Sequence, residues 1–423
     1  MREKTQIFLY FLLCGLLLFT ACISLVSAVT GDGGGSPDEI TLHAVVPTNG
    51  DLAQLGIASE IAMQQAVEDF NSFYQNVSSP RVIRLETHEV SSDPASALAA
   101  VKKLHDEGVH MVIGFFSSSQ LAAVKPYADE HGILILSTGS SSISLSIPDD
   151  NIYRFNPDDT SQGDALSTLL KRENISVIVP LVREDLWDNF SKMTILDNSM
   201  NTTPPHEEVR YNPGTEGVDE IVSRLDTTVG SVLKEADEKD TAVLVFTFDD
   251  IVPIMEEAAD EKTYPNLTHI RLIGTDGNTL NPELLTSPAS ANFGLNHGFI
   301  GYTPYISDLG TSVEYGNIVK KLGYEPNGYA YTSYDMTGIA AQTAFLHGSD
   351  DIEALKEAVF TTANHYRGML AAGSLNAAGD RIRTYYAYWK LEKESDGSIG
   401  WKISGVWEKI NPGRAATIVD YTP

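Results

Sequence analysis

The chain has 423 residues and a mass of 46.0 kDa, with 42% hydrophobic and 20% charged residues. This composition is globular, and the length exceeds what one hydrophobic core usually holds, so we expect two domains. The 29 Lys and Arg residues against 57 Asp and Glu residues give a formal charge of −28. Phosphate backbones would repel so acidic a chain, which argues against nucleic-acid binding.

The N-terminus has the features of an export signal. Arg2 and Lys4 precede an uncharged run over residues 7–29, which matches the basic and apolar regions of a signal peptide. The run allows three fates: lipidation at Cys22 after a lipobox-like FTAC, cleavage after Ala28, or retention as a spanning helix.

We therefore expect an exported protein, anchored to the outer face of the cytoplasmic membrane. Residues 1–29 are predicted to be the signal peptide or membrane anchor, and the Gly-rich residues 30–38 a flexible linker. Both cysteines, Cys14 and Cys22, lie in the first segment, so the exported body has no thiol chemistry. Glycosylation triplets begin at Asn76, Asn174, Asn189, Asn201 and Asn266.

From residue 39 onward, short apolar runs alternate with stretches of helical spacing. The predicted strands are residues 40–46, 82–88, 111–114, 133–136, 177–180, 242–246 and 270–273. The predicted helices are residues 58–73, 94–107 and 331–346, with others beginning near Gln162, Val218 and Ile251, and strands near 383–390 and 401–407 follow. Such alternation favours parallel sheets covered by helices.

The fold class expected is therefore α/β, with two Rossmann-like lobes joined by several hinge strands. We predict that lobe one comprises residues 39–157 and 304–367, and lobe two residues 158–303 and 368–423. A chain that crosses between lobes and returns permits hinge closure over a ligand.

Two Ser-rich loops follow consecutive strands of the first lobe. Residues 117–120 (SSSQ) lead into a predicted helix, and residues 137–142 (STGSSS) follow the next strand. Hydroxyls and free backbone N–H groups would converge there, which suits a carboxylate, although Ser-rich loops also serve as helix caps and turns.

In the second lobe, Asp276 follows a strand, where its carboxylate could pair with an ammonium group or simply form a turn. Trp187 and Tyr334 are aromatic residues in polar surroundings, able to cover a ligand or to pack against a neighbour. Enzyme signatures are poor: Ser118 has no evident general base and the ten histidines show no metal-ligand spacing. We expect no catalytic residue, metal or cofactor.

The ordered motifs of the body resemble the type I periplasmic solute-binding proteins, specifically the leucine/isoleucine/valine-binding group of branched-chain amino-acid ABC transporters. The segments that carry the resemblance are residues 50–56 (GDLAQLG), 93–95 (DPA), 112–119 (VIGFFSSS), 132–139 (GILILSTG), 154–163 (RFNPDDTSQG) and 274–277 (GTDG).

The resemblance implies two lobes that close on a small ligand. It places Ser118, Ser140 and Ser141 on the ligand's carboxylate, Asp276 on its ammonium group and Asp159 at a hinge-side polar position. The family's aromatic positions fall on Trp187, Phe248 and Tyr334.

Two departures from the family's usual residues leave the identity of the ligand undecided. Leu55 replaces a frequent aromatic, and Ser140 replaces a usual Ala. We expect an extracytoplasmic protein that captures an amino acid, branched-chain or related, and delivers it to the permease subunits of an ABC importer. The alternatives are a sensory module of the same fold, a binder of an amide, urea or aromatic acid, and a secreted hydrolase using a Ser-rich loop.

Overall fold

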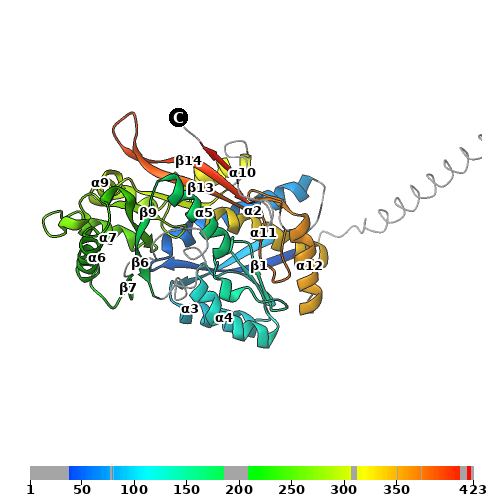
Figure 1. Cartoon of the computed structure of the whole chain (residues 1–423). Coiled ribbons are helices and arrows are strands. Elements are labelled where there is room, and N and C mark those ends of the chain that lie inside the picture. Colours follow the sequence, from blue (N-terminus) through cyan, green and yellow to red (C-terminus); the bar gives the residue numbers. More distant parts are fainter. Residues whose placement is uncertain are drawn as a thin grey trace, which may run out of the picture. The chain divides into compact units, whose positions relative to one another are not determined.

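A computed structural model describes residues 38–76, 79, 81–184, 208–305, 312–349, 351–372, 374–409 and 417–420. The predicted anchor, most of the linker, Trp187 and the triplets at Asn189 and Asn201 lie outside these residues. Residues 40–423 form one compact unit, built on two large sheets (Figure 1). No helix among the described residues is long and apolar enough to cross a membrane.

The first sheet has the strand order β2-β1-β3-β4-β5. Its strands are β1 (Asp38–Asn49), β2 (Arg81–Ser91), β3 (Met111–Gly114), β4 (Leu134–Ser137) and β5 (Ile152–Arg154). The pairs β1–β3, β3–β4 and β4–β5 are parallel, so β3, β4 and β5 end at the same edge. Because side chains alternate along a strand, Ala44 and Val45 of β1 are buried in different apolar clusters.

The second sheet has eight strands in the order β15-β14-β13-β10-β9-β8-β6-β7. Its strands are β6 (Val177–Arg183), β7 (Val209–Tyr211), β8 (Thr241–Phe246), β9 (Arg271–Gly274), β10 (Ile300–Pro304), β13 (Thr384–Lys393), β14 (Ile399–Lys409) and β15 (Thr417–Asp420). Strands β7, β6, β8, β9 and β10 are parallel, and the last three add antiparallel. A small pair, β11 (Arg367–Gly368) and β12 (Ala371–Ala372), stands apart.

Helices lie between the strands in the sequence. They are α2 (Ala53–Asn76), α3 (Pro94–Asp106), α4 (Ser118–His131), α5 (Asp159–Arg172), α6 (Val218–Val232), α7 (Ile251–Ala258), α8 (Pro282–Thr286), α9 (Pro288–Asn296), α10 (Val313–Leu322), α11 (Gly328–His347) and α12 (Ile352–His365), with 3-10 turns at Ile143–Leu145, Glu238–Asp240 and Pro265–Leu267. Several begin at side-chain caps, among them Asp93, Ser117, Asp158 and Asn327.

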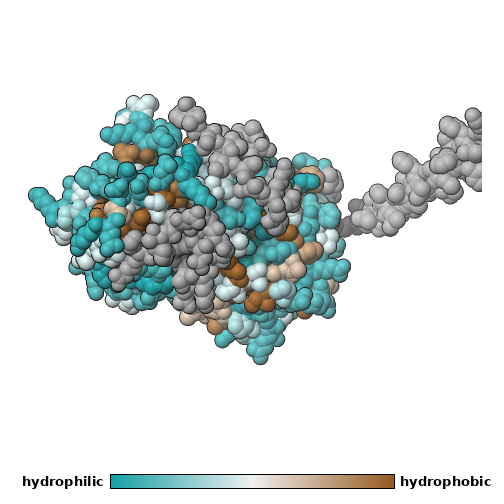
Figure 2. Space-filling model, viewed as in Figure 1, coloured by the Kyte–Doolittle hydropathy of each residue, from teal (hydrophilic) through white to brown (hydrophobic). Residues whose placement is uncertain are grey.

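The core joins the two sheets. Helix α11 packs along α2 and also contacts β3, β4 and β10, so a helix late in the chain reaches both sheets (Figure 1). The largest apolar cluster contains Leu136 of the first sheet and Ile273 of the second. The surface face in Figure 2 is mostly hydrophilic with small scattered apolar spots, as expected for a chain of charge −28.

The α/β fold class with parallel-sheet cores is confirmed, and each predicted strand and helix has a counterpart. Strands β5, β7, β10, β11, β12 and β15, each of two to five residues, were not predicted. The lobe boundaries at residues 157, 303 and 367 stay a prediction.

Candidate functional site

The turn from β3 to α4 brings Ser118 to the edge of the first sheet. Gly114 ends β3 at φ 140°, and a Cβ there would lie 2.2 Å from the carbonyl oxygen of Val45, so only glycine fits. Ser117 caps α4 by accepting a hydrogen bond from the backbone N–H of Gln120 (3.2 Å). Ser118 is thus the first residue of α4, where backbone N–H groups lack helical partners.

The two Ser-rich loops meet, as the sequence predicts for consecutive parallel strands. The Oγ atoms of Ser118 and Ser140 lie 3.1 Å apart, and the backbone N–H of Ser142 donates to Ser118 Oγ (3.2 Å). Ser140 and Ser141 are buried, while Ser118 is half-buried. The hydroxyls of Ser118 and Ser140 are therefore in contact at the N-terminus of α4, next to the backbone of Ser142.

Asp159, the first residue of α5, adjoins this cluster. Its backbone N–H donates to the carbonyl of Ser141 (2.9 Å), and the Ser141 side chain also bonds its carboxylate. Burial raises the pKa of Asp159 to about 6, although the bond from Ser141 lowers it.

Asp276, in the loop after β9, is fully buried. Burial, and then the negative charge of Asp159, raise its pKa to about 7. The hydroxyl of Tyr329 lies 3.4 Å from Asp276 Oδ2, and Gly139 lets that ring approach, because a Cβ at Gly139 would lie 2.7 Å from it. A residue of the second Ser-rich loop, the start of α11 and the loop after β9 therefore meet here.

The start of α11 holds the Asp276 loop in place. Asn327 caps α11 and its Nδ2 donates to the carbonyls of Asp276 (2.6 Å) and Thr279 (2.7 Å). Thr303 on β10 donates in turn to Asn327 Oδ1 (3.0 Å). These buried hydrogen bonds hold the backbone of the loop that carries Asp276. The position of the Asp276 carboxylate is fixed as a result.

Buried polar atoms around the two carboxylates lack partners. We call Asp159, Gln162, Asp276, Tyr302, Tyr329 and Tyr386 the acidic site. Among the residues the structure describes, no hydrogen-bond partner is found for Asp159 Oδ1, Asp276 Oδ1, or the hydroxyls of Tyr302 and Tyr386. The side chain of Gln162 faces the Asp276 carboxylate and acts to lower its pKa. Unsatisfied buried polar atoms are costly, and so many together indicate a place for a polar ligand.

The tyrosines of the acidic site are neutral donors. Burial, reinforced by the charge of Asp276, raises the pKa of Tyr302 and Tyr386 well above the ordinary value. Their rings meet edge to face at 5.6 Å. The site therefore offers two carboxylates and several hydroxyls, a combination suited to a cationic group with N–H donors.

The structure places the predicted aromatic residues in different surroundings. A Cβ on Gly277 would lie 2.8 Å from Phe248, so Phe248 packs against the loop of Asp276, and its predicted contact with the ligand stays a prediction. Tyr334 is not in the acidic site: it lies on α11 and packs against α2, where its hydroxyl donates to Asp69 (2.9 Å). Trp187 lies outside the described residues.

Sequence reasoning missed Tyr329, Gln162, Tyr302 and Tyr386. The helix containing Tyr329 was predicted to begin three residues too late, at 331 instead of Gly328. The cap signal of Asn327, followed by glycine, marks the true start and puts Tyr329 in the first turn. Tyr302 and Tyr386 lie on adjacent antiparallel strands, which no local pattern connects.

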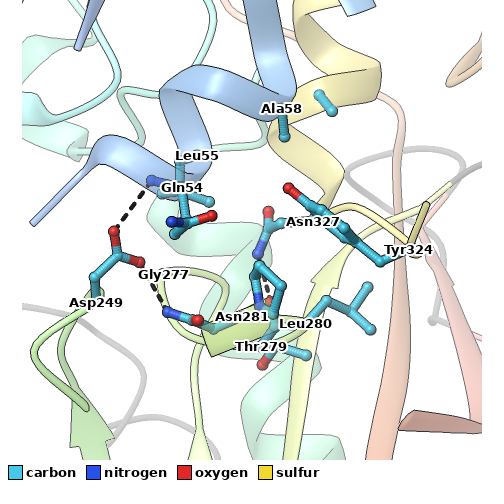
Figure 3. Close-up of a pocket in the computed structure, with 12 residues that line it drawn as sticks. Gln54, Leu55, Ala58, Asp249, Gly277, Thr279, Leu280, Asn281, Tyr324 and Asn327 are labelled. Carbon is cyan, nitrogen blue, oxygen red and sulfur yellow. Dashed lines mark hydrogen bonds between the residues drawn. The ribbon is translucent and has the colours of Figure 1, made fainter. Parts of the chain in front are cut away.

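A pocket opens where α2 faces the loops of the second sheet, lined in part by Gly277 and Asn327 beside the acidic site (Figure 3). Asp249 bridges the two sides: its carboxylate accepts from the backbone N–H of Gln54 (3.1 Å) and from Asn281 Nδ2 (2.8 Å). Burial, and then the charge of Glu283, raise the pKa of Asp249 to about 7. Because every oxygen of Asp249 has a partner, this contact joins protein segments rather than offering free acceptors.

An ion pair joins the same sides. Arg183, at the end of β6, contacts Asp51 of the loop after β1 (3.0 Å) and Asp250 of the second sheet's loops (3.0 Å). The backbone N–H of Asp249 also donates to the carbonyl of Asp51 (3.2 Å). The first-sheet loop at Asp51 is thereby tied to the second sheet, as in a closed clamp.

Known proteins share this architecture. The family described as the receptor family ligand-binding region matches residues 58–398, and the chain belongs to it. Its fold is that of the type I periplasmic binding proteins of the branched-chain amino-acid group, as the sequence predicted.

Three relatives illustrate the likeness. An uncharacterised protein of Methanocaldococcus jannaschii is 23% identical, over 95% of this chain and 98% of its own length. The leucine-binding protein LivK of Thermotoga maritima has a TM-score of 0.70 at 18% identity, covering 88% of this chain and 99% of its own. A solute-binding protein of R. palustris in complex with 4-hydroxybenzoate has a TM-score of 0.70 at 15% identity, covering 89% and 98%.

Proposed function

We propose that the chain is the extracytoplasmic binding protein of an ABC importer and captures a ligand that carries an ammonium group, most simply an amino acid. The acidic site holds the ammonium group through Asp276 and Asp159. The Ser118–Ser140–Ser141 cluster at the start of α4 receives the ligand's carboxylate. Closure of two lobes around this ligand presents the protein to the permease subunits.

The observation that carries the proposal is the buried pair of carboxylates, each with an oxygen that lacks a partner among the described residues. Two ionised carboxylates in a water-free space repel each other and lose their hydration. A ligand cation between them offsets both costs, so the ligand stabilises the closed form far more than the open form. A ligand can shift a conformational equilibrium only through such a difference.

The serine cluster supports the other end of the ligand. The first backbone N–H groups of α4 and the hydroxyls of Ser118 and Ser140 lie together, and a helix N-terminus favours an anion. Ser141 links this cluster to Asp159 through its carbonyl and its side chain. A zwitterionic ligand would therefore have a site for its carboxylate directly beside a site for its ammonium group.

A ligand with a carboxylate and no amino group is the contrasting case, since the R. palustris neighbour holds 4-hydroxybenzoate. Such an anion would leave Asp159 and Asp276 buried without a counter-charge, and we expect the acidic site to disfavour it. A sensory role for the same fold would need a signalling partner in place of permease subunits. Genes for permease and ATPase subunits beside this one would distinguish the two roles.

The deciding experiment is calorimetric titration of the purified protein with L-amino acids, urea, short amides and aromatic acids. We expect binding of an amino acid that falls at least about 100-fold in Asp276→Asn, because charge-assisted buried bonds are worth several kcal/mol. Asp69→Asn is the matched control, since Asp69 is a partly buried carboxylate bonded to Tyr334 outside the site. Binding only of ligands without an amino group, unchanged in Asp276→Asn, would contradict the ammonium assignment.

The proposed export and membrane anchoring rest on the N-terminal sequence alone. We expect the wild-type protein in the membrane fraction, and release into the soluble extracytoplasmic fraction when residues 1–29 are replaced by a cleavable signal. The mass of the mature protein separates lipidation from a retained helix, because only a lipidated protein begins at Cys22 with added acyl mass, which Cys22→Ala must lose.

A further inference from the structure

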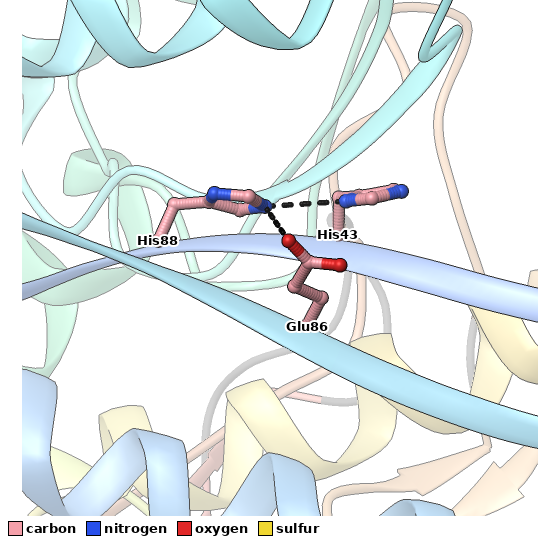
Figure 4. Close-up of side chains that lie close together, drawn as sticks. All are labelled: His43, Glu86 and His88. Carbon is pink, nitrogen blue, oxygen red and sulfur yellow. Dashed lines mark hydrogen bonds and ion pairs between the residues drawn. The ribbon is translucent and has the colours of Figure 1, made fainter. Parts of the chain in front are cut away.

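We propose that His43, Glu86 and His88 form a binding site for a divalent transition-metal ion that prefers imidazole and carboxylate ligands, such as Zn²⁺. His43 lies on β1, and Glu86 and His88 lie on the neighbouring strand β2 (Figure 4). One ligand atom from each of the three residues lies within 4.8 Å of the others. The site is independent of the acidic site and of the proposed transport function.

The distances fit a metal ion between the side chains. His43 Nδ1 and His88 Nε2 lie 3.2 Å apart. Two zinc–nitrogen bonds of about 2.0–2.1 Å at a tetrahedral angle place their nitrogens about 3.3 Å apart. Glu86 Oε1 lies 3.8 Å from His88 Nε2, so a small side-chain rotation brings the third ligand into place.

The strands hold two of the ligands in position. His43 and His88 belong to hydrogen-bonded neighbouring strands and are both half-buried, on the face shared with Val45 and Val90. Glu86 is exposed, so the ion can enter from solvent and keep a water as fourth ligand. Two rigid ligands and one adaptable ligand cost little entropy to assemble.

The local charge also favours a cation. The carboxylates of Glu86 and Glu107 both act on His43 in the direction that stabilises positive charge. The positive charge of Lys103 lies 3.8 Å from the carboxylate of Glu107. Because both side chains are largely exposed, water screens this ion pair.

Sequence spacing could not reveal this site. His43 and His88 are 45 residues apart, and the zinc patterns that sequence reading recognises place ligand pairs two to five residues apart. The strand order of the first sheet, with β2 beside β1, brings the two histidines together.

The test is calorimetric titration of the purified protein with ZnCl₂ and NiCl₂, alongside His43→Ala, His88→Gln and Glu86→Gln. We expect one equivalent bound by the wild type, binding weakened at least about 10-fold by either histidine change, and a smaller loss for Glu86→Gln. His365→Ala is the control, because His365 is an exposed histidine on α12 whose Nδ1 bonds the carbonyl of Thr361.

Thermal unfolding supplies a second readout that does not depend on calorimetry. Added Zn²⁺ should raise the melting temperature of the wild type and of His365→Ala, and should not raise that of His43→Ala or His88→Gln. The same variants without metal must melt as cooperatively as the wild type, which shows that they fold. Absence of stoichiometric binding by the wild type, or equal binding by all variants, would overturn the proposal.

Discussion

The negative charge of Asp159 raises the pKa of Asp276 across the acidic site, second only to burial itself. One residue begins α5 and the other follows β9, so the repulsion acts between segments brought together by the fold. Closing the site without a cation therefore favours protonation of at least one of the carboxyl groups. In the proposed clamp, this coupling would link lobe closure to pH.

We predict that acid favours closure of the ligand-free protein. In the structure, burial and Asp159 raise the pKa of Asp276 from 3.8 to about 7, and in an open, hydrated site we expect the pKa to stay near 3.8, so the closed form would hold more protons between these values. Closure is therefore favoured as the pH falls from 8 to 5, and at pH 8 the ionised carboxylate opposes it by roughly 4 kcal/mol. Small-angle scattering should show a smaller radius of gyration at pH 5 than at pH 8.

Asp276→Asn provides the check on that prediction. The amide carries no charge, so the variant should show a smaller change of radius between pH 8 and pH 5 than the wild type, and the remaining change is due to Asp159 and Asp249, whose pKa values are also raised into this range. If wild type and variant show the same radius at both pH values, the carboxyl groups do not control closure.

We predict that the ion pair of Arg183 and Asp51 stabilises the closed, ligand-bound form. Arg183 is buried and contacts Asp51 at 3.0 Å, whereas the Asp51 side chain is 42% exposed. Because water screens the exposed partner, Asp51→Asn should weaken ligand affinity only about 2- to 5-fold, mainly through faster dissociation. Stopped-flow dissociation kinetics measure this effect, and an unchanged dissociation rate would show that the contact does not hold the lobes together.

Substitutions at Tyr329 and Tyr334 should distinguish a tyrosine that binds the ligand from one that packs between helices. Tyr329→Phe removes a hydroxyl that lies 3.4 Å from Asp276, so we expect ligand affinity to fall roughly 10-fold with little loss of stability. Tyr334→Phe removes the bond to Asp69, so the free energy of unfolding should fall by about 1 kcal/mol while affinity is kept. Calorimetry and urea unfolding on both variants test the pair, and the reverse pattern would place Tyr334 at the ligand.

The contrast between these tyrosines shows what the sequence could predict. Alternating strands and helices were enough to predict the α/β fold, and polar residues after strands pointed to the two Ser-rich loops and Asp276, because strand ends in a parallel sheet share one edge. The family resemblance then named Ser118 and Ser140 within those loops. Tyr334 was named from its polar neighbours and from the same resemblance, but α11 turns it toward α2. Gln162, Tyr302 and Tyr386 became visible only when α5 and the antiparallel strands were placed.

The buried ion pair of Arg154 and Asp380 should be among the most important for stability. Their side chains are 1% and 2% exposed, and Arg154 Nε donates to Asp380 Oδ1 at 2.6 Å. Arg154 also donates to the carbonyl of Ser142 (2.6 Å), so the pair ties a late segment of the chain to the second Ser-rich loop. Asp380→Ala leaves a buried guanidinium without its counter-charge, and we expect the free energy of unfolding to fall by about 3–5 kcal/mol.

Asp164→Ala is the matched control for this prediction. Asp164 forms an ion pair of the same length, 2.6 Å, with Lys409, but its side chain is 51% exposed. Since solvent screens an exposed pair, its loss should cost less than about 1 kcal/mol. Urea unfolding of both variants gives the comparison. Equal losses would mean that burial of Arg154 does not determine the cost, and that the closed arrangement of this loop is maintained by other contacts.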